Sequence, residues 1–324
     1  MLRDILRGDD PQITALLQVI TAVRPDVLHL TDLDYDLDGH ALTALQNMLA
    51  TQGLDYPYRF TAHPNSGLST PLDMDGDGRL GGPGDAQGFG FFRGQGGMAI
   101  LSRFPIPVPQ VRDFSGFLWA DLPGATAATR PDGTPFPSTQ AFGIQRLSSV
   151  GHWDVPVILP NGTVLHLLAF HATTPVFDGP EDHNGWRNHD ELEFWRLYLE
   201  NALPDQPADA PFVLLGDANL DPADGEGRQN AIRTLLAHPM LQDPAPESVG
   251  GALAANTHHT GRPGLDTADW GDPVPGNLRV DYVLPAHNLT VQGAGVFWPA
   301  PDAPLGDAVR KASRHRLVWV DLVF

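Results

Sequence analysis

Hydrophobic positions recur at two spacings along the chain, which indicates a mixture of helices and strands. After Asp10-Pro11, apolar residues recur every three or four positions, as on one face of a helix. Short apolar runs bounded by Gly, Pro or Asp are typical of buried strands. Such runs lie at 27–30, 98–101, 153–159, 164–170, 212–215, 280–284, 296–298 and 317–323. Further helices are expected at 42–49, 187–202 and 228–237.

The chain shows no internal repeat and no Gly/Ser or charge-run linker, so we expect a single domain over residues 1–324. Pro and Gly gather in long loops, and the longest is an Asp/Gly-rich insertion at about 63–97. Long loops inside a compact domain usually carry function or bind ions. Strands outnumber crossover helices, which favours packed sheets flanked by helices over a doubly wound fold.

Composition narrows the possible functions. The 20 Lys and Arg stand against 39 Asp and Glu, a formal charge of −19, and there is no Cys. The lack of Cys excludes disulfide scaffolds, Cys-ligated metals and thiol nucleophiles. The acidic balance argues against tight binding of duplex nucleic acid, but a bound cation can reverse the local sign at a phosphate site. No apolar run is long enough for a membrane span, and the first ten residues do not form a signal peptide.

Polar residues gather where predicted strands end. Asp217 and Asn219 follow the run 212–215, and residues i and i+2 of an extended segment face the same side. They therefore point toward one reactive centre, or they close the strand in an Asx turn. Asp281 lies among apolar residues, where a carboxylate needs a partner or a metal. His315, just before the run 317–323, is either that partner or a capped surface histidine.

Two further strand ends carry candidate groups. His171 closes the run 164–170, and Asp32 follows the run 27–30. Acidic residues continue beyond Asp32 at alternate positions, as far as Asp38. This cluster is either a site for a hard cation or a solvated acidic loop.

The order of these features resembles the endonuclease/exonuclease/phosphatase superfamily across nearly the whole chain. The matching elements are Asp32 and His171 at strand ends, 97–106 (GMAILSRFPI), 216–219 (GDAN), 279–284 (RVDYVL) and 313–315 (SRH). A segment at 267–270 (TADW) and the long insertion resemble a bacterial branch. The resemblance implies a four-layer α/β (α+β) sandwich, with two packed, mainly antiparallel sheets flanked by helices. It also implies divalent-metal hydrolysis of phosphoesters.

The resemblance also implies roles for residues. Asp32 would bind catalytic Mg²⁺ or Mn²⁺, Asp217 with Asn219 would position the attacking water, and Asp281 would orient His315. His315 would stabilise the phosphoryl oxygens or the leaving group. His171 matches a second polar residue of the site.

Three departures from the superfamily pattern are visible. Asp32 replaces the usual Glu, and Arg314 replaces an Asp. The second change disfavours a second metal and suggests that Arg314 contacts phosphate. The family's first strand is apparently missing, which suggests a truncated or misassigned start.

The insertion contains the beginning of a calcium loop, with Asp73, Asp75 and Asp77 at positions 1, 3 and 5 and Gly78 after them. The Glu expected at position 12 is absent, because Gly84 stands there. We expect a structural Ca²⁺ here; the alternative is a disordered Gly/Asp-rich loop. Near the start of the helix expected at 187–202, Arg187 and Asn188 are predicted phosphate contacts, or caps of that helix.

The sequence therefore predicts a metal-dependent phosphoesterase, with a small phosphodiester or phosphomonoester favoured over nucleic acid. The alternatives are a secreted nuclease and a calcium-stabilised binding protein on a decayed enzyme fold. We expect a monomer without a membrane span. The compartment is open, with a lean toward periplasm or exterior if the true start lies upstream.

Overall fold

The computed structural model describes residues 2–324. Its α-helices are α1 (Leu2–Arg7), α2 (Pro11–Val23), α3 (His40–Thr51), α4 (Thr139–Ile144), α5 (His183–Leu199), α6 (Asn230–Leu236), α7 (Val249–Leu253) and α8 (Gly306–Ala312). Its strands are β1 (Val27–Leu33), β2 (Tyr58–Phe60), β3 (Gly97–Ser102), β4 (Arg112–Asp113), β5 (Gly151–Ile158), β6 (Val164–His171), β7 (Phe212–Asp217), β8 (Ala268–Asp269), β9 (Asn277–Leu278), β10 (Asp281–Pro285), β11 (Thr290–Phe297) and β12 (Leu317–Val323).

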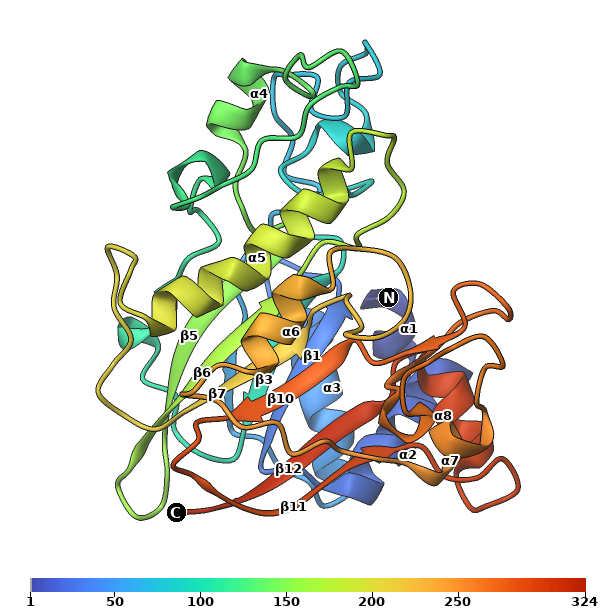
Figure 1. The fold of residues 1–324 in the computed structure, drawn as a ribbon. Helices are drawn as coiled ribbons and strands as arrows, with labels where there is room; N and C mark the ends of the chain where they lie inside the picture. Colours follow the sequence, from blue (N-terminus) through green and yellow to red (C-terminus); the bar gives the residue numbers. More distant parts are fainter. Residues whose placement is uncertain (1) are drawn as a thin grey trace.

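The strands form two central layers, as expected for a sandwich (Figure 1). One layer is a five-stranded sheet in the order β10-β7-β6-β5-β4, in which only β6 and β7 run parallel. The other layer contains β1-β3-β2 and, separately, β11-β12, all antiparallel. A small β8-β9 ladder stands apart from both.

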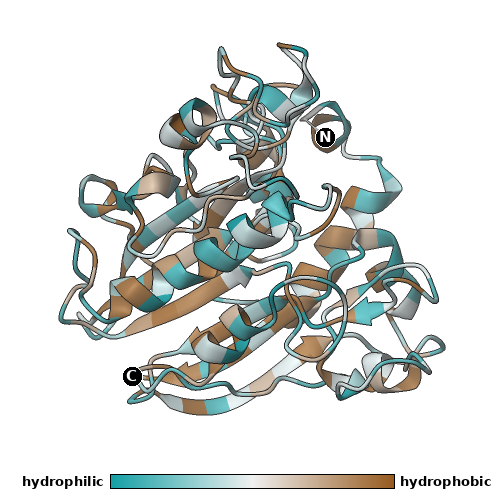
Figure 2. Cartoon of the chain, turned by 45° about the horizontal axis from the view of Figure 1, so that its top comes forward, coloured by the Kyte–Doolittle hydropathy of each residue, from teal (hydrophilic) through white to brown (hydrophobic). Residues whose placement is uncertain are grey.

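Hydrophobic clusters of buried side chains hold these layers together, and the sheets are the most apolar part of the chain (Figure 2). Side chains of β3, β5, β6 and β7 pack between the two sheet layers, around Ile100 and Trp153. α5 and α6 cover the outer face of the five-stranded sheet, with Trp195 fully buried. α1, α2 and α3 cover β1 and β3 around Leu45. The predicted four-layer α/β fold is confirmed.

The second sheet layer differs from the expectation of one continuous sheet. Within residues 2–324, β1 bonds only to β3 and β12 bonds only to β11, so the layer is in two pieces. Both strands are only partly buried, whereas β3 is buried along its length. That the family's first strand is missing from this chain stays a prediction.

The long insertion is ordered although it contains little regular structure. Asn65 donates hydrogen bonds to the carbonyls of Ser115 and Ser148, and Gln87 donates to that of Ile144. The insertion is therefore fixed to the loops on both sides of α4. None of the helices in the described part of the chain has the length and apolar character needed to span a bilayer.

Candidate active site

Strand register places three predicted site residues side by side. His171 at the end of β6 pairs with Asp217 at the end of β7, and Asp217 pairs with Asp281 at the start of β10. β7 approaches β6 so closely that a Cβ on Gly216 would lie 2.0 Å from the carbonyl oxygen of Phe170. Glycine at this position therefore lets the strand ends meet.

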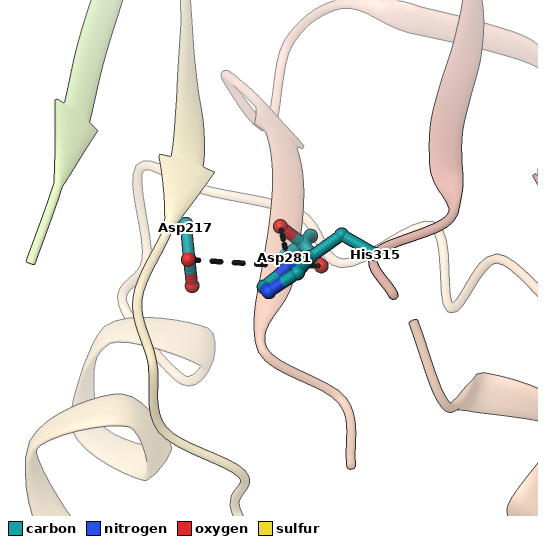
Figure 3. Close-up of side chains that lie close together, drawn as sticks. All are labelled: Asp217, Asp281 and His315. Atoms are coloured by element: carbon teal, nitrogen blue, oxygen red, sulfur yellow. Dashed lines mark hydrogen bonds and ion pairs between the residues drawn. The ribbon is translucent and has the colours of Figure 1, made fainter. Parts of the chain in front are cut away.

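His315 joins this row from another part of the chain. A backbone bridge to Ala268 holds it just before β12. Its Nδ1 lies 2.9 Å and 3.1 Å from the two carboxylate oxygens of Asp281, and 4.0 Å from Oδ2 of Asp217 (Figure 3). The predicted pairing of Asp281 with His315 is present, so His315 is not a capped surface histidine.

The charges of this row depend on one another. Burial alone would lower the pKa of His315, but Asp281 and then Asp217 outweigh it and raise the pKa to about 10. Burial, followed by repulsion from Asp281, raises the pKa of Asp217 to about 6. At neutral pH the row therefore holds an imidazolium beside carboxylates. The raised pKa makes the Asp217 carboxylate a stronger base than an aspartate in water.

Asp217 is fixed by its neighbours and is only 2% exposed. The backbone N–H of Asn219 donates to its Oδ1 at 2.7 Å, and Nε2 of His171 lies 3.4 Å from its Oδ2. Asn219 adopts a left-handed backbone conformation (φ 50°) and donates from its side chain to the carbonyl of Ala172. Strain of this kind at a non-glycine residue persists only where the surroundings enforce it, as at many functional sites.

Asp32 lies close to this row but is exposed to solvent. It also has a left-handed backbone (φ 54°), at an irregularity in the pairing of β1 with β3. Its negative charge adds to the rise in the pKa of His315, so the two groups interact.

The residues present fit a divalent cation. Ligand atoms of Asp217, Asp281 and His315 all lie within 4.8 Å of one another. His315 Nδ1 is engaged by Asp281, so the oxygen donors of this group are the carboxylates of Asp217 and Asp281. Asp32 is not in the group, and its role as a metal ligand stays a prediction. Carboxylate oxygens are the ligands that Mg²⁺ and Mn²⁺ prefer.

The segment 267–270 contributes two residues, Thr267 and Trp270, for which no role was predicted from the sequence. Thr267 is fully buried, and its hydroxyl donates to Oδ2 of Asp281 at 2.8 Å. The same hydroxyl accepts hydrogen bonds from the backbone N–H groups of Val280 and Asp281. The ring of Trp270 meets the imidazole of His315 edge-on, with centroids 5.4 Å apart. The feature of the sequence that could have indicated these two roles is the position of a Thr and a Trp shortly before the segment 279–284 (RVDYVL).

Arg187 and Asn188, the predicted phosphate contacts, are buried and donate to backbone carbonyls, so their contact with phosphate stays a prediction. Arg187 is 5% exposed and donates to the carbonyls of Leu147, Arg146, Ser148 and Gln87. Asn188 is fully buried and donates to the carbonyls of Thr173 and Ala218. The start of α5 is covered by loops, which periodicity in the sequence does not reveal. Arg314, by contrast, is exposed beside His315, and within residues 2–324 no hydrogen bond or ion pair of its guanidinium is found.

The insertion brings a second acidic group together, with one change from the prediction. Carboxylate oxygens of Asp73, Asp75 and Asp85 lie within 4.8 Å of one another. Asp77 is not in this group and accepts a hydrogen bond from the backbone of Arg79. The third member of the group is Asp85 instead of Asp77, and Asp85 directly follows Gly84 at the expected position 12.

The sequence of this chain is similar to that of a known protein family. The profile of the Endonuclease/Exonuclease/phosphatase family matches residues 5–315. None of the curated protein sequences matches the chain.

Three solved structures of similar fold cover almost the whole chain. An endonuclease/exonuclease/phosphatase from Beutenbergia cavernae has a TM-score of 0.57 at 20% identity, covering 97% of this chain and 66% of its own length. A mannosyl-6-phosphatase from Bacteroides thetaiotaomicron has a TM-score of 0.51 at 14% identity, covering 99% and 95%. A 3′ phosphatase from Neisseria, bound to a product DNA hairpin, has a TM-score of 0.50 at 15% identity, covering 97% and 95%. Identities this low show the fold alone.

Proposed function

The chain belongs to the endonuclease/exonuclease/phosphatase family, and from this premise we propose that it hydrolyses a phosphoester of modest size by in-line attack of water. The observation that supports this most is the row of His171, Asp217 and Asp281, completed by His315. Members of the family are phosphoester hydrolases. The substrate and the metal requirement belong to our proposal.

The proposed role of each site residue follows from its charge. Asp217 holds the attacking water and accepts its proton, since a carboxylate with a raised pKa is a stronger base than a solvated one. His315, an imidazolium held by Asp281, faces the negative charge that develops on the phosphoryl oxygens or the leaving group. Arg314, which is exposed beside His315, contacts a phosphate oxygen. A Mg²⁺ or Mn²⁺ ion held by Asp32 would polarise the phosphoryl oxygen.

The first test is hydrolysis of bis-p-nitrophenyl phosphate and p-nitrophenyl phosphate with Mg²⁺, Mn²⁺ or Ca²⁺. Replacing Asp217 by Ala, or His315 by Gln, is expected to lower kcat by about 10²–10⁴-fold, the usual contribution of general acid–base groups. The matched control is Asp209→Asn, an exposed aspartate before the opposite end of β7. Unchanged activity in Asp217→Ala would disprove the assignment.

A nuclease is the competing activity within the same chemistry. The charge of −19 disfavours a polyanionic substrate. Nicking of plasmid DNA at enzyme concentrations that leave bis-p-nitrophenyl phosphate intact would overturn the preference for a small substrate. If no metal supports hydrolysis of any of these esters, the binding-protein hypothesis replaces the enzyme.

A structural Ca²⁺ in the insertion is part of the same proposal, with Asp73, Asp75 and Asp85 as ligands. Burial and the neighbouring carboxylates raise the pKa of Asp75, so the group carries negative charge that a cation would relieve. Millimolar Ca²⁺ is expected to raise Tm, because a ligand that binds only the folded state stabilises it. Asp75→Asn should remove this rise, and Asp38→Asn on an exposed loop should keep it.

A further inference from the structure

A groove of about 630 Å³ lies between α1, the loop after β1 and the insertion. Its apolar wall consists of Leu6, Tyr35 and Phe92, and its basic residues are Arg3 and Arg7. These residues come from three separate parts of the chain, and none of them has a role in the hydrolytic step described above.

Gly96 lies between the groove wall and Asp32. The backbone N–H of Gly96 donates to Oδ1 of Asp34, a residue of the groove wall, at 3.1 Å. A Cβ on Gly96 would lie 3.2 Å from Oδ1 of Asp32, the candidate metal ligand. Asp32, near the end of β1, and Asp34 of the groove wall are thus two residues apart and approach the same glycine. A phosphoester bound at Asp32 therefore has this groove next to it.

The aromatic wall is held rigidly although it is only partly buried. The backbone N–H of Tyr35 donates to the carbonyl of Gly94 at 2.7 Å, and the Tyr35 ring packs on His63 at a centroid distance of 5.1 Å. The backbone of Phe92 is so close to Gly67 that a Cβ there would lie 2.0 Å from the Phe92 carbonyl oxygen. The Phe92 side chain is nevertheless 52% exposed. An exposed aromatic side chain on a backbone held by close contacts stabilises the fold little and is suited to contact a ligand.

The charged residues of the groove are two arginines, Arg3 and Arg7, and two aspartates, Asp34 and Asp36. Asp36 accepts from the backbone of His40 and Ala41 at the start of α3, so its carboxylate is engaged in the fold. Arg3 and Arg7 lie one helical turn apart, and their ion pairs to Asp4 (3.8 Å) and Asp9 (3.1 Å) involve exposed guanidinium groups. Surface pairs of this kind are weak and exchange readily for another anion.

We propose that this groove binds the alcohol part of the substrate, and that this alcohol is aromatic and carries a second anionic group. The inference rests on the proposed function, because it assigns the substrate class of the same site. The aromatic faces of Tyr35 and Phe92 and the side chain of Leu6 receive the ring. Arg3 and Arg7 pair with the additional anion.

Binding of non-hydrolysable phosphonates tests the groove separately from catalysis. Calorimetry in Mg²⁺ would compare methylphosphonate, benzylphosphonate and 4-carboxybenzylphosphonate. Benzylphosphonate is expected to bind about 5–10-fold more tightly than methylphosphonate, as one aromatic contact allows. The carboxylate should add a further ~3-fold, a typical gain from an exposed ion pair.

Variants assign these gains to residues. Phe92→Ala and Tyr35→Leu should remove the advantage of the benzyl group while leaving methylphosphonate affinity unchanged. Phe89→Ala is the matched control, because Phe89 is exposed in the same insertion and does not line the groove. The double variant Arg3→Ala/Arg7→Ala should lose only the gain from the carboxylate. Thermal melting of each variant checks that it is folded.

The outcomes separate the two proposals. Equal affinity for methyl- and benzylphosphonate, or an unchanged preference in Phe92→Ala, overturns the groove inference and leaves the hydrolase proposal intact. Failure of all three phosphonates to bind, together with absent hydrolysis, overturns the proposed function itself.

Discussion

Single hydroxyl and carboxyl groups decide how the catalytic pair is held. Thr267 bonds both to the Asp281 carboxylate and to two backbone N–H groups. Thr267→Val leaves these buried partners unsatisfied, so we expect a loss of about 1–3 kcal/mol of unfolding free energy. Activity should fall about tenfold, because the pair of Asp281 and His315 is then held less accurately in position. The alkaline limb of the pH–rate profile should move to lower pH, because Asp281 then holds His315 less firmly.

Thr267→Ser keeps the hydroxyl and serves as the control for this change. It should retain the wild-type pH profile even if the lost methyl group lowers Tm. A Thr267→Val enzyme with unchanged kcat and an unchanged alkaline limb would show that Thr267 only supports the fold.

Asp266 gives a stability prediction with a defined sign. Burial, with the nearby Asp221 and Asp224, raises its pKa from 3.8 to about 7. The folded state therefore holds this proton more tightly than the unfolded chain, and stability falls as pH rises from about 4 to about 7. Asp266→Asn removes the penalty, so Tm should rise by a few degrees at pH 8.

The difference between Asp266→Asn and wild type should become small near pH 3.5, where the carboxyl group is largely protonated in both states. Exposed Asp302→Asn is the matched control. A stabilisation of equal size at both pH values would contradict the assigned cause.

The position of a site residue could be predicted from the sequence only where the residue lies next to an apolar run. Asp217 and Asp281 follow or begin apolar runs, so their place at strand ends follows from the sequence. Arg187 and Asn188 have the residue types of a phosphate site, but four backbone carbonyls surround the guanidinium of Arg187. Those carbonyls come from segments distant in sequence, and no local pattern reports them.

Among the elements, the spacing between β6 and β7 controls the geometry of the site. Gly216→Ala would place a methyl group against the backbone of Phe170, so the two strands must separate. We expect a loss of about 1–3 kcal/mol of stability, typical of overpacking, and a larger relative loss of kcat because His171 and Asp217 shift apart. Denaturant unfolding and kinetics at saturating substrate measure the two effects.

The control is Gly293→Ala in β11, where the nearest atom to the new Cβ would be 3.4 Å away. This variant should keep both stability and activity. If Gly216→Ala matches it, the close approach of the strands is not needed.

Long elements with strong periodicity were predictable, and short ones were not. The runs at 164–170 and 212–215 became β6 and β7 within a few residues. β4, β8 and β9 have two residues each, too few for any periodicity. α5 begins at His183, before the predicted residue 187, because its first turn is polar yet buried under loops.

Across the whole molecule, the charge of −19 predicts an unusual response to salt. A nuclease with a basic surface binds its substrate less tightly as salt rises. Here added salt screens the repulsion of an anionic substrate. We therefore expect KM for p-nitrophenyl phosphate to fall by about twofold between 20 and 150 mM NaCl, since surface effects are of this order.

The control substrate is bis-p-nitrophenyl phosphate, a monoanion. The neutral p-nitrophenyl acetate is unsuitable because it is not a phosphoester. Its KM should change less than that of the dianionic monoester. A KM that rises with salt for both esters would indicate a local basic field that outweighs the net charge.

The meeting of His315 with Asp281 and Asp217 has a consequence for the order of synthesis on the ribosome. Asp32 emerges early, but the segment that carries His315 emerges only after every strand of the five-stranded sheet. If the proposed role of His315 holds, a nascent chain that has already folded β5, β6 and β7 together is expected to be still inactive. Hydrolysis would then begin only after translation has passed His315 and would not report the folding of the sheet.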